Sequence, residues 1–286
     1  MPRPNFLIIG AAKAGTSWIS RKLEQHPDVF IGDSTYFFDN PRHWANGVAW
    51  YERCFEAGTG KRAVGEKTPS YLWGSKCSED DPNFVPARVR QGLPDARIIV
   101  ILRNPVARAV SHFNYAIRTG HLSPLYNIDK VLRGTQAPTK SARILERGLY
   151  CRQLERWMNI FPRKQIRILF LERDAIARPN QTLAELCRFL DIDASFPFKD
   201  ADKADNQRLS RPELILKYYA PPIQKLVHAV LKPLLDRLPK KGINPGPETI
   251  AFLQNYYADE NSRLAKLLGI DLSCWCPPDS RLAKAA

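Results

Sequence analysis

The sequence has no pair of cysteines separated by two residues, no cluster of histidines and no long apolar run. Without such ligand sets we predict no metal site, and the six scattered cysteines are expected to be reduced, partly buried thiols. The first apolar run, residues 6–9, is too short for the core of a signal peptide or for a membrane span. These absences predict a cytoplasmic protein without a membrane span.

Negative charge is scarce. Lys and Arg number 43 against 29 Asp and Glu, which gives a formal net charge of +14. This excess indicates an anionic partner such as a nucleotide or an acidic glycan, although it can also serve solubility alone. Because the aromatic residues do not interleave with a basic stripe, we predict no nucleic-acid partner. The oligomeric state is not indicated.

The chain of 286 residues contains no internal repeat or low-complexity tract, and it is long enough to bury a sizeable core. We predict one domain over residues 1–286. Strand and helix signals alternate in the first half, which predicts an α/β fold with a parallel sheet flanked by helices, followed by a helical C-terminal part. Strands are expected at 5–10, 28–31, 62–66, 97–102 and 165–170. Helices are expected at 16–26, 48–55, 83–91, 105–118, 128–132, 149–160 and 180–190, and through most of 213–268.

The turn after the first strand has the chemistry of a phosphate cradle. It reads Gly-Ala-Ala-Lys-Ala-Gly-Thr-Ser-Trp over residues 10–18. Small residues let backbone N–H groups converge on an anion at the start of a helix, while Thr16 and Ser17 add hydroxyls and Lys13 adds a charge. An ATP-binding P-loop has a Lys where Thr16 stands, so the displaced Lys13 argues against it. A turn that serves packing alone is the other alternative.

The order Lys13-Ala14-Gly15-Thr16-Ser17-Trp18 resembles the 5′-phosphosulfate motif of sulfotransferases that use 3′-phosphoadenosine 5′-phosphosulfate (PAPS). A second segment, Leu102 to Ser111, resembles the 3′-phosphate motif of the same family. The resemblance implies a P-loop-like three-layer fold with PAPS as donor. It also implies that Arg103 and Ser111 bind the 3′-phosphate, while Trp18 is a candidate to stack on the adenine.

The resemblance, to the heparan-sulfate-type and bacterial enzymes, extends over nearly the whole chain. It includes His-Pro-Asp-Val at 26–29, Gly-Glu-Lys-Thr-Pro-Ser-Tyr at 65–71, Arg-Gly-Leu-Tyr at 147–150 and Leu-Leu-Gly-Ile-Asp at 267–271. It implies that Lys13 stabilises the leaving phosphate and that Lys67 is a second active-site lysine. An exposed loop lysine is the structural alternative for Lys67.

One departure concerns the general base. The heparan-sulfate-type enzymes carry a Lys-Glu pair just before the aromatic pair that matches Phe37 and Phe38, and this chain has none. Three residues are candidate substitutes, namely Asp33, Glu66 and His112, and we place Asp33 slightly ahead. Each also has an ordinary structural interpretation.

The sequence therefore predicts transfer of a sulfuryl group from PAPS to a hydroxyl or amine, for which a carbohydrate is one candidate. The alternatives are a protein that binds PAPS or its product PAP (adenosine 3′,5′-bisphosphate) without catalysis, and a P-loop kinase. The acceptor is not identified. Its expected walls are residues 39–50, 74–83 and 120–143, with Trp44, Trp50 and Trp73 as candidate stacking residues.

Overall fold

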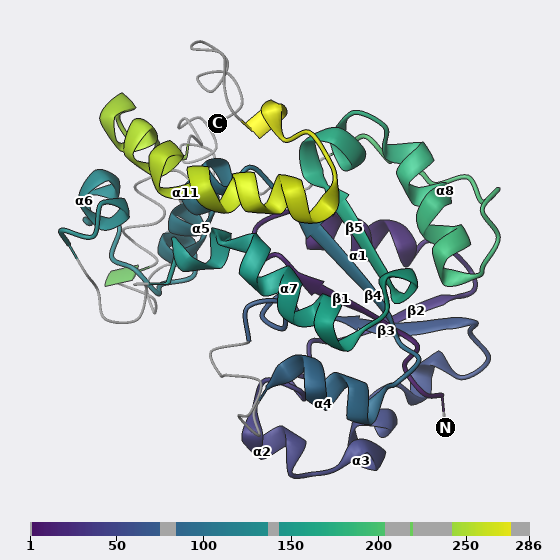
Figure 1. Ribbon diagram of the computed structural model, residues 1–286. Coiled ribbons are helices and arrows are strands. Elements are labelled where there is room, and N and C mark those ends of the chain that lie inside the picture. The colour runs from purple at the N-terminus through teal and green to yellow at the C-terminus, as the bar shows by residue number, and fades with distance from the viewer. Residues whose placement is uncertain (1, 75–83, 137–142, 204–217, 220–241, 276–286) are drawn as a thin grey trace, which may run out of the picture. The chain divides into compact units, whose positions relative to one another are not determined.

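The computed structural model describes residues 2–74, 84–136, 143–203, 218–219 and 242–275 (Figure 1). The contacts divide the chain into two compact units, each made of two stretches. The first unit comprises Met1–Arg103 and Tyr150–Asp205, and the second comprises Asn104–Leu149 and Asn206–Ala286. The single domain over 1–286 stays a prediction.

The first unit is built on a parallel sheet of five strands in the order β2-β3-β1-β4-β5. The strands are β1 (Phe6–Gly10), β2 (Val29–Gly32), β3 (Ala63–Lys67), β4 (Arg97–Leu102) and β5 (Ile166–Phe170). Every residue of β1 is buried, as an unbroken apolar run predicts for a strand covered on both faces. All five expected strands form, so the predicted α/β fold is confirmed.

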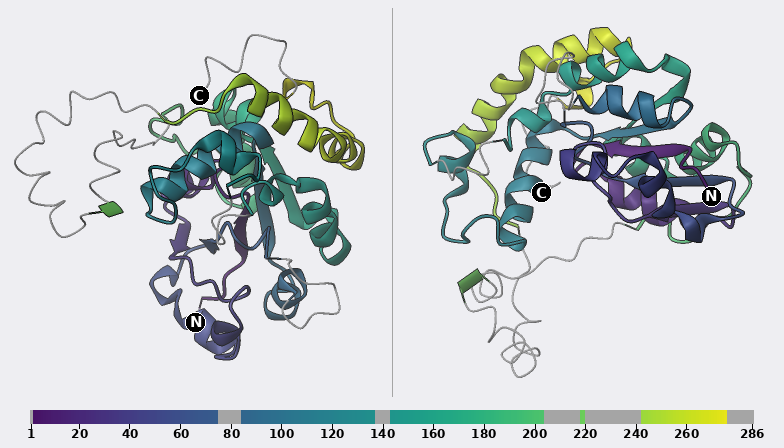
Figure 2. Two further views of the ribbon diagram at one scale, coloured as in Figure 1. Left: turned by 90° about the vertical axis from the view of Figure 1, so that its left-hand side faces the viewer. Right: turned by 90° about the horizontal axis from the view of Figure 1, so that it is seen from below.

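Helices flank this sheet on both sides (Figures 1 and 2). They are α1 (Thr16–Leu23), α2 (Pro41–Trp44), α3 (Val48–Arg53), α4 (Val85–Gly92), α7 (Tyr150–Ile160) and α8 (Pro179–Leu190). The chain moves one way across the sheet from β1 to β2 and the other way from β3 to β4. Right-handed crossovers therefore put α1 and α4 on opposite faces. Consistent with this, α1 packs on α8 and α4 packs on α7.

The largest differences from the expected helices concern α1 and α2. Helix α1 ends at Leu23 rather than at residue 26, and tight turns that run to His26 follow before Pro27. The four-residue helix α2 was not predicted. It starts where Asn40 accepts a hydrogen bond from the backbone N–H of Arg42 and Pro41 takes the first helical position, a local capping pattern that the expectation overlooked.

The second unit is helical, with α5 (Pro105–Arg118), α6 (Ile128–Leu132) and α11 (Pro247–Leu268) around its own apolar core. Asn104 caps α5, because its side chain accepts from the N–H groups of Val106 and Ala107 at 2.9 and 3.2 Å. Phe113 of α5 packs in this core with Leu253 and Tyr257 of α11. The helices expected between 213 and 241 lie outside the described residues, apart from 218–219.

Short helical turns complete the two units. They are η1 (Glu56–Gly58), η2 (Glu146–Gly148), η3 (Arg163–Gln165), the π-type turn η4 (Leu171–Ile176) and η5 (Ser273–Trp275).

Candidate active site

The turn between β1 and α1 requires its glycine. Gly15 takes a φ of 104°, in the left-handed region that favours glycine. A Cβ atom at this position would lie 2.8 Å from Cδ1 of Leu171, the first residue of η4. The turn is also tied to β4, because the N–H of Ala11 donates to the carbonyl of Ile101 at 2.7 Å. The backbone of the predicted cradle is therefore held from two sides.

The N-terminus of α1 suits an anion electrostatically. No side chain among the described residues caps it, and its first turn carries no acidic residue. Thr16 is buried and Ser17 is exposed, so both hydroxyls stand in the first turn beside the positive end of the helix dipole. Trp18 is half-buried, and its indole N–H donates to the carbonyl of Ala201 at 2.9 Å.

Arg103 meets the phosphate turn directly. Its guanidinium donates to the carbonyl of Lys13 at 3.4 Å, so the structure brings together residues that lie 90 positions apart. The carbonyl of Arg103 in turn accepts from the hydroxyl of Tyr150 at 2.9 Å, at the start of α7. Ser111, its predicted partner, is a half-buried residue of α5 in the second unit.

Lys67 ends β3 at the same edge of the sheet as the phosphate turn. It pairs with Ile8 of β1, two residues before Gly10, which ends that strand. The carbonyl of Lys67 accepts from the hydroxyl of Ser34 at 2.6 Å, which fixes the loop that follows β2 onto the end of β3. Asp33, the favoured base, is an exposed residue of this loop.

Glu66 is wholly buried beside Lys67. Its Oε2 accepts from the hydroxyl of Thr35 at 2.7 Å and from the backbone N–H of Thr35 at 3.2 Å. Burial raises the pKa of Glu66 from 4.5 to about 7, even though hydrogen bonds from Tyr71 and Thr35 pull it down. This carboxyl group therefore gains and loses its proton near neutral pH.

Buried polar atoms without a partner in the described part of the chain occur in the segment that carries this carboxyl group and in Tyr51, which lies within electrostatic range of it. Among the described residues, Glu66 Oε1, Thr68 Oγ1, Ser70 Oγ and the hydroxyl of Tyr51 make no hydrogen bond of normal geometry. Thr68 and Tyr71 nevertheless face Glu66 closely enough to lower its pKa. Buried polar groups without a partner are rare, and they often mark a functional or hydrated site.

The ring of His43, in α2, is held by the same loop. Its Nδ1–H donates to the carbonyl of Thr35 at 2.7 Å, because a carbonyl can only accept. The lone pair of the neutral ring is then on Nε2. Sequence reasoning overlooked His43, since nothing in its local pattern indicates a contact with Thr35.

Glu24 is a second residue that sequence reasoning missed. Burial raises its pKa, while Lys67 and Arg21 lower it and Asp33 raises it further. Glu24 therefore stands within electrostatic range of both Lys67 and Asp33. It follows the last turn of α1, where an acidic residue carries no sequence signal of a site.

His112, the third candidate base, accepts a hydrogen bond at Nδ1 from the guanidinium of Arg108 at 3.2 Å. A guanidinium cannot accept, so the proton of the neutral ring is on Nε2. The ring then has no free lone pair for a substrate proton, which disfavours His112 as a base. It lies in the second unit, where Arg108 also donates to the carbonyl of Ile144.

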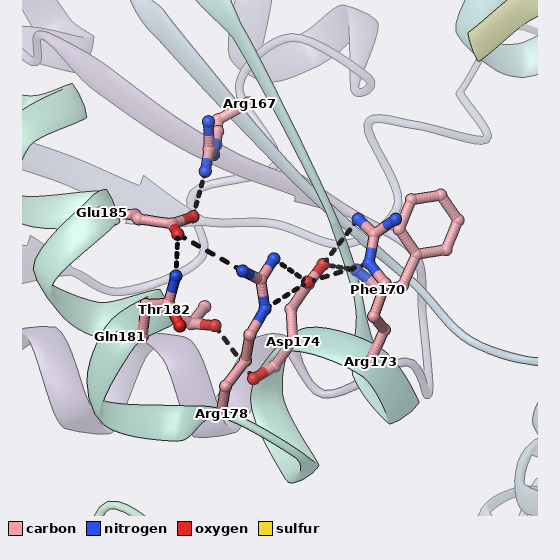
Figure 3. A network of polar contacts seen from close by, with 8 residues as sticks. All are labelled: Arg167, Phe170, Arg173, Asp174, Arg178, Gln181, Thr182 and Glu185. Atoms are coloured by element: carbon pink, nitrogen blue, oxygen red, sulfur yellow. Dashed lines mark hydrogen bonds and ion pairs between the residues drawn. The ribbon is translucent and has the colours of Figure 1, made fainter. Parts of the chain in front are cut away.

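A polar network fixes η4 behind the phosphate turn (Figure 3). The buried carboxylate of Asp174 accepts from the N–H of Phe170 at 2.7 Å, from Arg173 at 3.0 Å and from Arg178 at 2.6 Å. Burial raises the pKa of Asp174, but the hydrogen bonds from the two arginines outweigh it and lower that pKa. Arg178 also pairs with Glu185 of α8, which contacts Arg167 of β5. The network thus supports Leu171 against Gly15.

Two of the predicted stacking residues lie in an aromatic cluster. The ring centroid of Trp44 is 5.1 Å from that of Phe37, and the ring of Trp50 stacks on Phe37 at 6.0 Å. The guanidinium of Arg88 lies over Trp44 at 5.2 Å. Both tryptophans are half-buried, so each has one part in this packing and one part exposed. Residues 75–83 and 137–142 of the predicted acceptor walls lie outside the described residues.

A family model described as a sulfotransferase domain matches residues 3–210 of this chain. Among curated proteins, the membrane-associated sulfotransferase kil1 of Dictyostelium discoideum is 25% identical, over 66% of this chain and 56% of that protein. The human heparan sulfate glucosamine 3-O-sulfotransferase 6 is 31% identical, over 56% of this chain and 44% of that protein. The chain thus spans about half the length of the curated relatives it matches.

Solved structures agree with this fold. A sulfotransferase from Alicyclobacillus acidocaldarius is 26% identical with a TM-score of 0.70, and the match covers 97% of this chain and 100% of that chain. The sulfotransferase domain from the curacin biosynthetic pathway is 12% identical with a TM-score of 0.51, over 90% of this chain and 98% of that chain, and shares the fold. Within the described residues, no helix has the length and apolar character to span a membrane.

Proposed function

Because the chain belongs to the sulfotransferase domain family, we propose that it transfers a sulfuryl group from PAPS to a hydroxyl or amine and releases PAP. The observation that carries this proposal is the hydrogen bond from Arg103 to the carbonyl of Lys13. It joins the end of β4 to the phosphate turn, and PAPS is a nucleotide with phosphate at both its 3′ and 5′ positions. An ATP-binding turn has no need of a second phosphate site.

The donor is bound in two parts. The 5′-phosphosulfate occupies the turn, where the backbone N–H of Gly15 and the hydroxyls of Thr16 and Ser17 donate at the helix N-terminus. Ala14 lines the turn, and its own N–H donates to the carbonyl of Ala11 at 3.1 Å. Arg103 binds the 3′-phosphate, since a guanidinium fork matches phosphate geometry. Ser111 and the stacking of Trp18 on adenine enter the proposal from their sequence motifs.

The chemistry is a displacement at sulfur. The acceptor attacks the sulfur in line with the bond to the bridging oxygen, and the electron pair of that bond passes to the 5′-phosphate. Lys13 stabilises the negative charge that develops on the leaving phosphate, and Lys67 contacts the sulfuryl group or the acceptor. Asp33 is the base that the sequence favours. We propose that these steps proceed without a metal.

For the acceptor we propose a carbohydrate. Relatives named as heparan sulfate glucosamine 3-O-sulfotransferases support it, as do the net charge of +14 and the partly exposed rings of Trp44 and Trp50. A location in the cytoplasm remains a prediction, and one relative is described as membrane-associated.

The test is transfer of ³⁵S from labelled PAPS to a glucosamine-containing heparan sulfate oligosaccharide and to simple alcohols and amines. We expect Lys13→Ala to lower kcat by about 10²–10³-fold, the loss typical of one transition-state donor. Lys61→Ala is the matched control, because Lys61 precedes the opposite end of β3 and binds only the carbonyl of Pro27 among the described residues. PAP binding without transfer to any acceptor would favour the non-catalytic alternative.

A further inference from the structure

Thr35 joins a partly exposed loop to a buried carboxyl group. Glu66 is fully buried, whereas Thr35 is half-buried on the loop that precedes Phe37 and Phe38. We propose that Thr35 takes the proton of the acceptor and passes its own hydroxyl proton to Glu66, in place of the Lys-Glu base. This inference rests on the proposed function and deepens it.

The hydroxyl of Thr35 has the hydrogen bonds that such a relay needs. It donates its proton to Glu66 Oε2 at 2.7 Å, and it accepts the N–H of Phe37 at 3.2 Å. The hydroxyl of Tyr71 lies within hydrogen-bonding range of both Thr35 and Glu66. A hydroxyl oxygen has two lone pairs, so when Tyr71 donates to Glu66 one lone pair of Thr35 remains for the proton of an acceptor. The relay atom is therefore already aligned with its proton acceptor and retains capacity on its other side.

The loop is also fixed at the edge where sulfuryl transfer is proposed. Ser34 is bonded to the carbonyl of Lys67, Thr35 to Glu66 through both its hydroxyl and its N–H, and His43 to the carbonyl of Thr35. Lys67 pairs with Ile8, just before the phosphate turn. Thr35 is thus held by three neighbouring contacts, whereas Asp33 is exposed.

The step balances. A bond forms between the acceptor oxygen or nitrogen and sulfur, and the bond between sulfur and the bridging oxygen breaks. The electron pair of the broken bond stays on the 5′-phosphate of PAP. One proton leaves the acceptor for Thr35 Oγ1 while the original hydroxyl proton of Thr35 moves to Glu66 Oε2. The reverse shift to solvent restores Thr35 and Glu66 after product release.

The surroundings of Glu66 suit a proton acceptor that works at neutral pH. The titratable groups that face it are Tyr51 and Cys54 at the end of the α3 segment and Tyr71 after β3. Burial raises the pKa of all three, and Glu66 itself raises them further. They therefore stay uncharged when Glu66 ionises. Lys67 is the neighbouring residue in sequence, and His43 faces the same loop from α2.

The experiment compares Thr35→Val, Thr35→Ser and Glu66→Gln in the ³⁵S transfer assay with the oligosaccharide, alcohol and amine probes. We expect Thr35→Val and Glu66→Gln each to lower kcat by about 10²–10⁴-fold, the usual range for general-base catalysis. Thr35→Ser keeps the hydroxyl and should retain most of the activity. Thr59→Val, a change of the same type on an exposed turn, is the control.

Three readouts separate a relay from a structural contribution. The double variant of Thr35→Val and Glu66→Gln should be no slower than either single variant, because both interrupt one path. The acidic limb of the wild-type kcat profile, with its midpoint near pH 7, should be lost in Glu66→Gln. PAP should bind each variant with its wild-type affinity. If Glu66→Gln does not fold, the two Thr35 variants carry the comparison.

The outcomes are distinguishable. An acidic limb that persists in Glu66→Gln and Thr35→Val but disappears in Asp33→Asn or His43→Gln overturns the relay and leaves the proposed function intact. Full activity of Thr35→Val does the same. Absence of transfer by the wild-type protein to every probe contradicts the relay and the proposed function together.

Discussion

Arg103 is a single residue at the end of β4 that two hydrogen bonds hold at the phosphate turn. Its carbonyl accepts from Tyr150, and its guanidinium reaches the carbonyl of Lys13. A guanidinium presents its donors in a fixed fork that can grip a phosphate bidentately. A lysine offers the charge without that geometry.

We therefore expect Arg103→Lys to weaken PAP binding by about 10- to 100-fold, the equivalent of one charge-assisted hydrogen bond. Adenosine 5′-monophosphate lacks the 3′-phosphate, so its affinity should change little. Calorimetric titration of both ligands makes the comparison. Equal losses for the two ligands would contradict the assignment of Arg103 to the 3′-phosphate.

Glu66 also makes a prediction for stability. Its folded pKa of about 7 lies above its ordinary value of 4.5, so the folded protein holds a proton that the unfolded chain releases between these values. The contribution of this bound proton to the stability of the folded protein is fully present below about pH 4.5 and is lost as pH rises through 7.

Urea unfolding at pH 5.5 and pH 8 tests this sign. Between pH 5.5 and pH 8, the free energy of unfolding of the wild-type protein should fall by roughly 2–3 kcal/mol more than that of Glu66→Gln. The two proteins differ because glutamine stays neutral at both pH values, whereas buried Glu66 must ionise at pH 8. An identical pH dependence in the two proteins would show that Glu66 does not titrate in this range.

Among the elements, η4 depends on a buried carboxylate for its place. Asp174 binds the N–H of Phe170 and two arginines (Figure 3). Leu171 of the same turn packs where a Cβ of Gly15 would lie. The position of η4 and the shape of the phosphate turn are thus coupled through packing within the first unit.

We expect Asp174→Asn to lower the free energy of unfolding by about 1–3 kcal/mol, because asparagine cannot satisfy all three donors. Both arginines are partly exposed, which reduces the loss through solvent screening. The control is Asp200→Asn, which removes an exposed ion pair with Lys203 and should have no measurable effect. Equal effects of the two changes would show that the network does not support η4.

The elements that sequence predicted well are those with local causes. The run Arg-Ile-Ile-Val-Ile-Leu predicts the bounds of β4. Asn104, a capping residue, and Pro105, a preferred first helical residue, mark the start of α5. The bond from Thr35 to Glu66 spans 31 positions and is absent from any local pattern. The same holds for the proximity of Glu24 to Lys67, which depends on how α1 packs beside β3.

For the candidate site, the sequence named the residues but not their connections. The family resemblance predicted roles for Lys13, Lys67 and Arg103, and the structure places all three where the ends of parallel strands meet at one edge of the sheet. It ranked Asp33 above Glu66 by distance in sequence. Burial, which decides whether a carboxyl group can hold a proton at neutral pH, depends on tertiary packing and could not be ranked that way.

For the whole molecule, the net charge of +14 bears on the partner. A positive field raises the rate at which an anionic donor or glycan associates, and salt screens it. The fold and the net charge are compatible with many acceptors. They therefore support the class of reaction more strongly than the identity of the acceptor.

The central claim is that the turn from Lys13 to Trp18 binds PAPS rather than ATP, and thermal unfolding with PAP or with ATP and Mg²⁺ tests it most directly. At about 100 times its Kd, PAP should stabilise the protein by about 2.7 kcal/mol, or roughly 5–10 °C in Tm. ATP with Mg²⁺ at the same concentration should leave Tm nearly unchanged. A rise in Tm with ATP and Mg²⁺ but not with PAP would contradict the account.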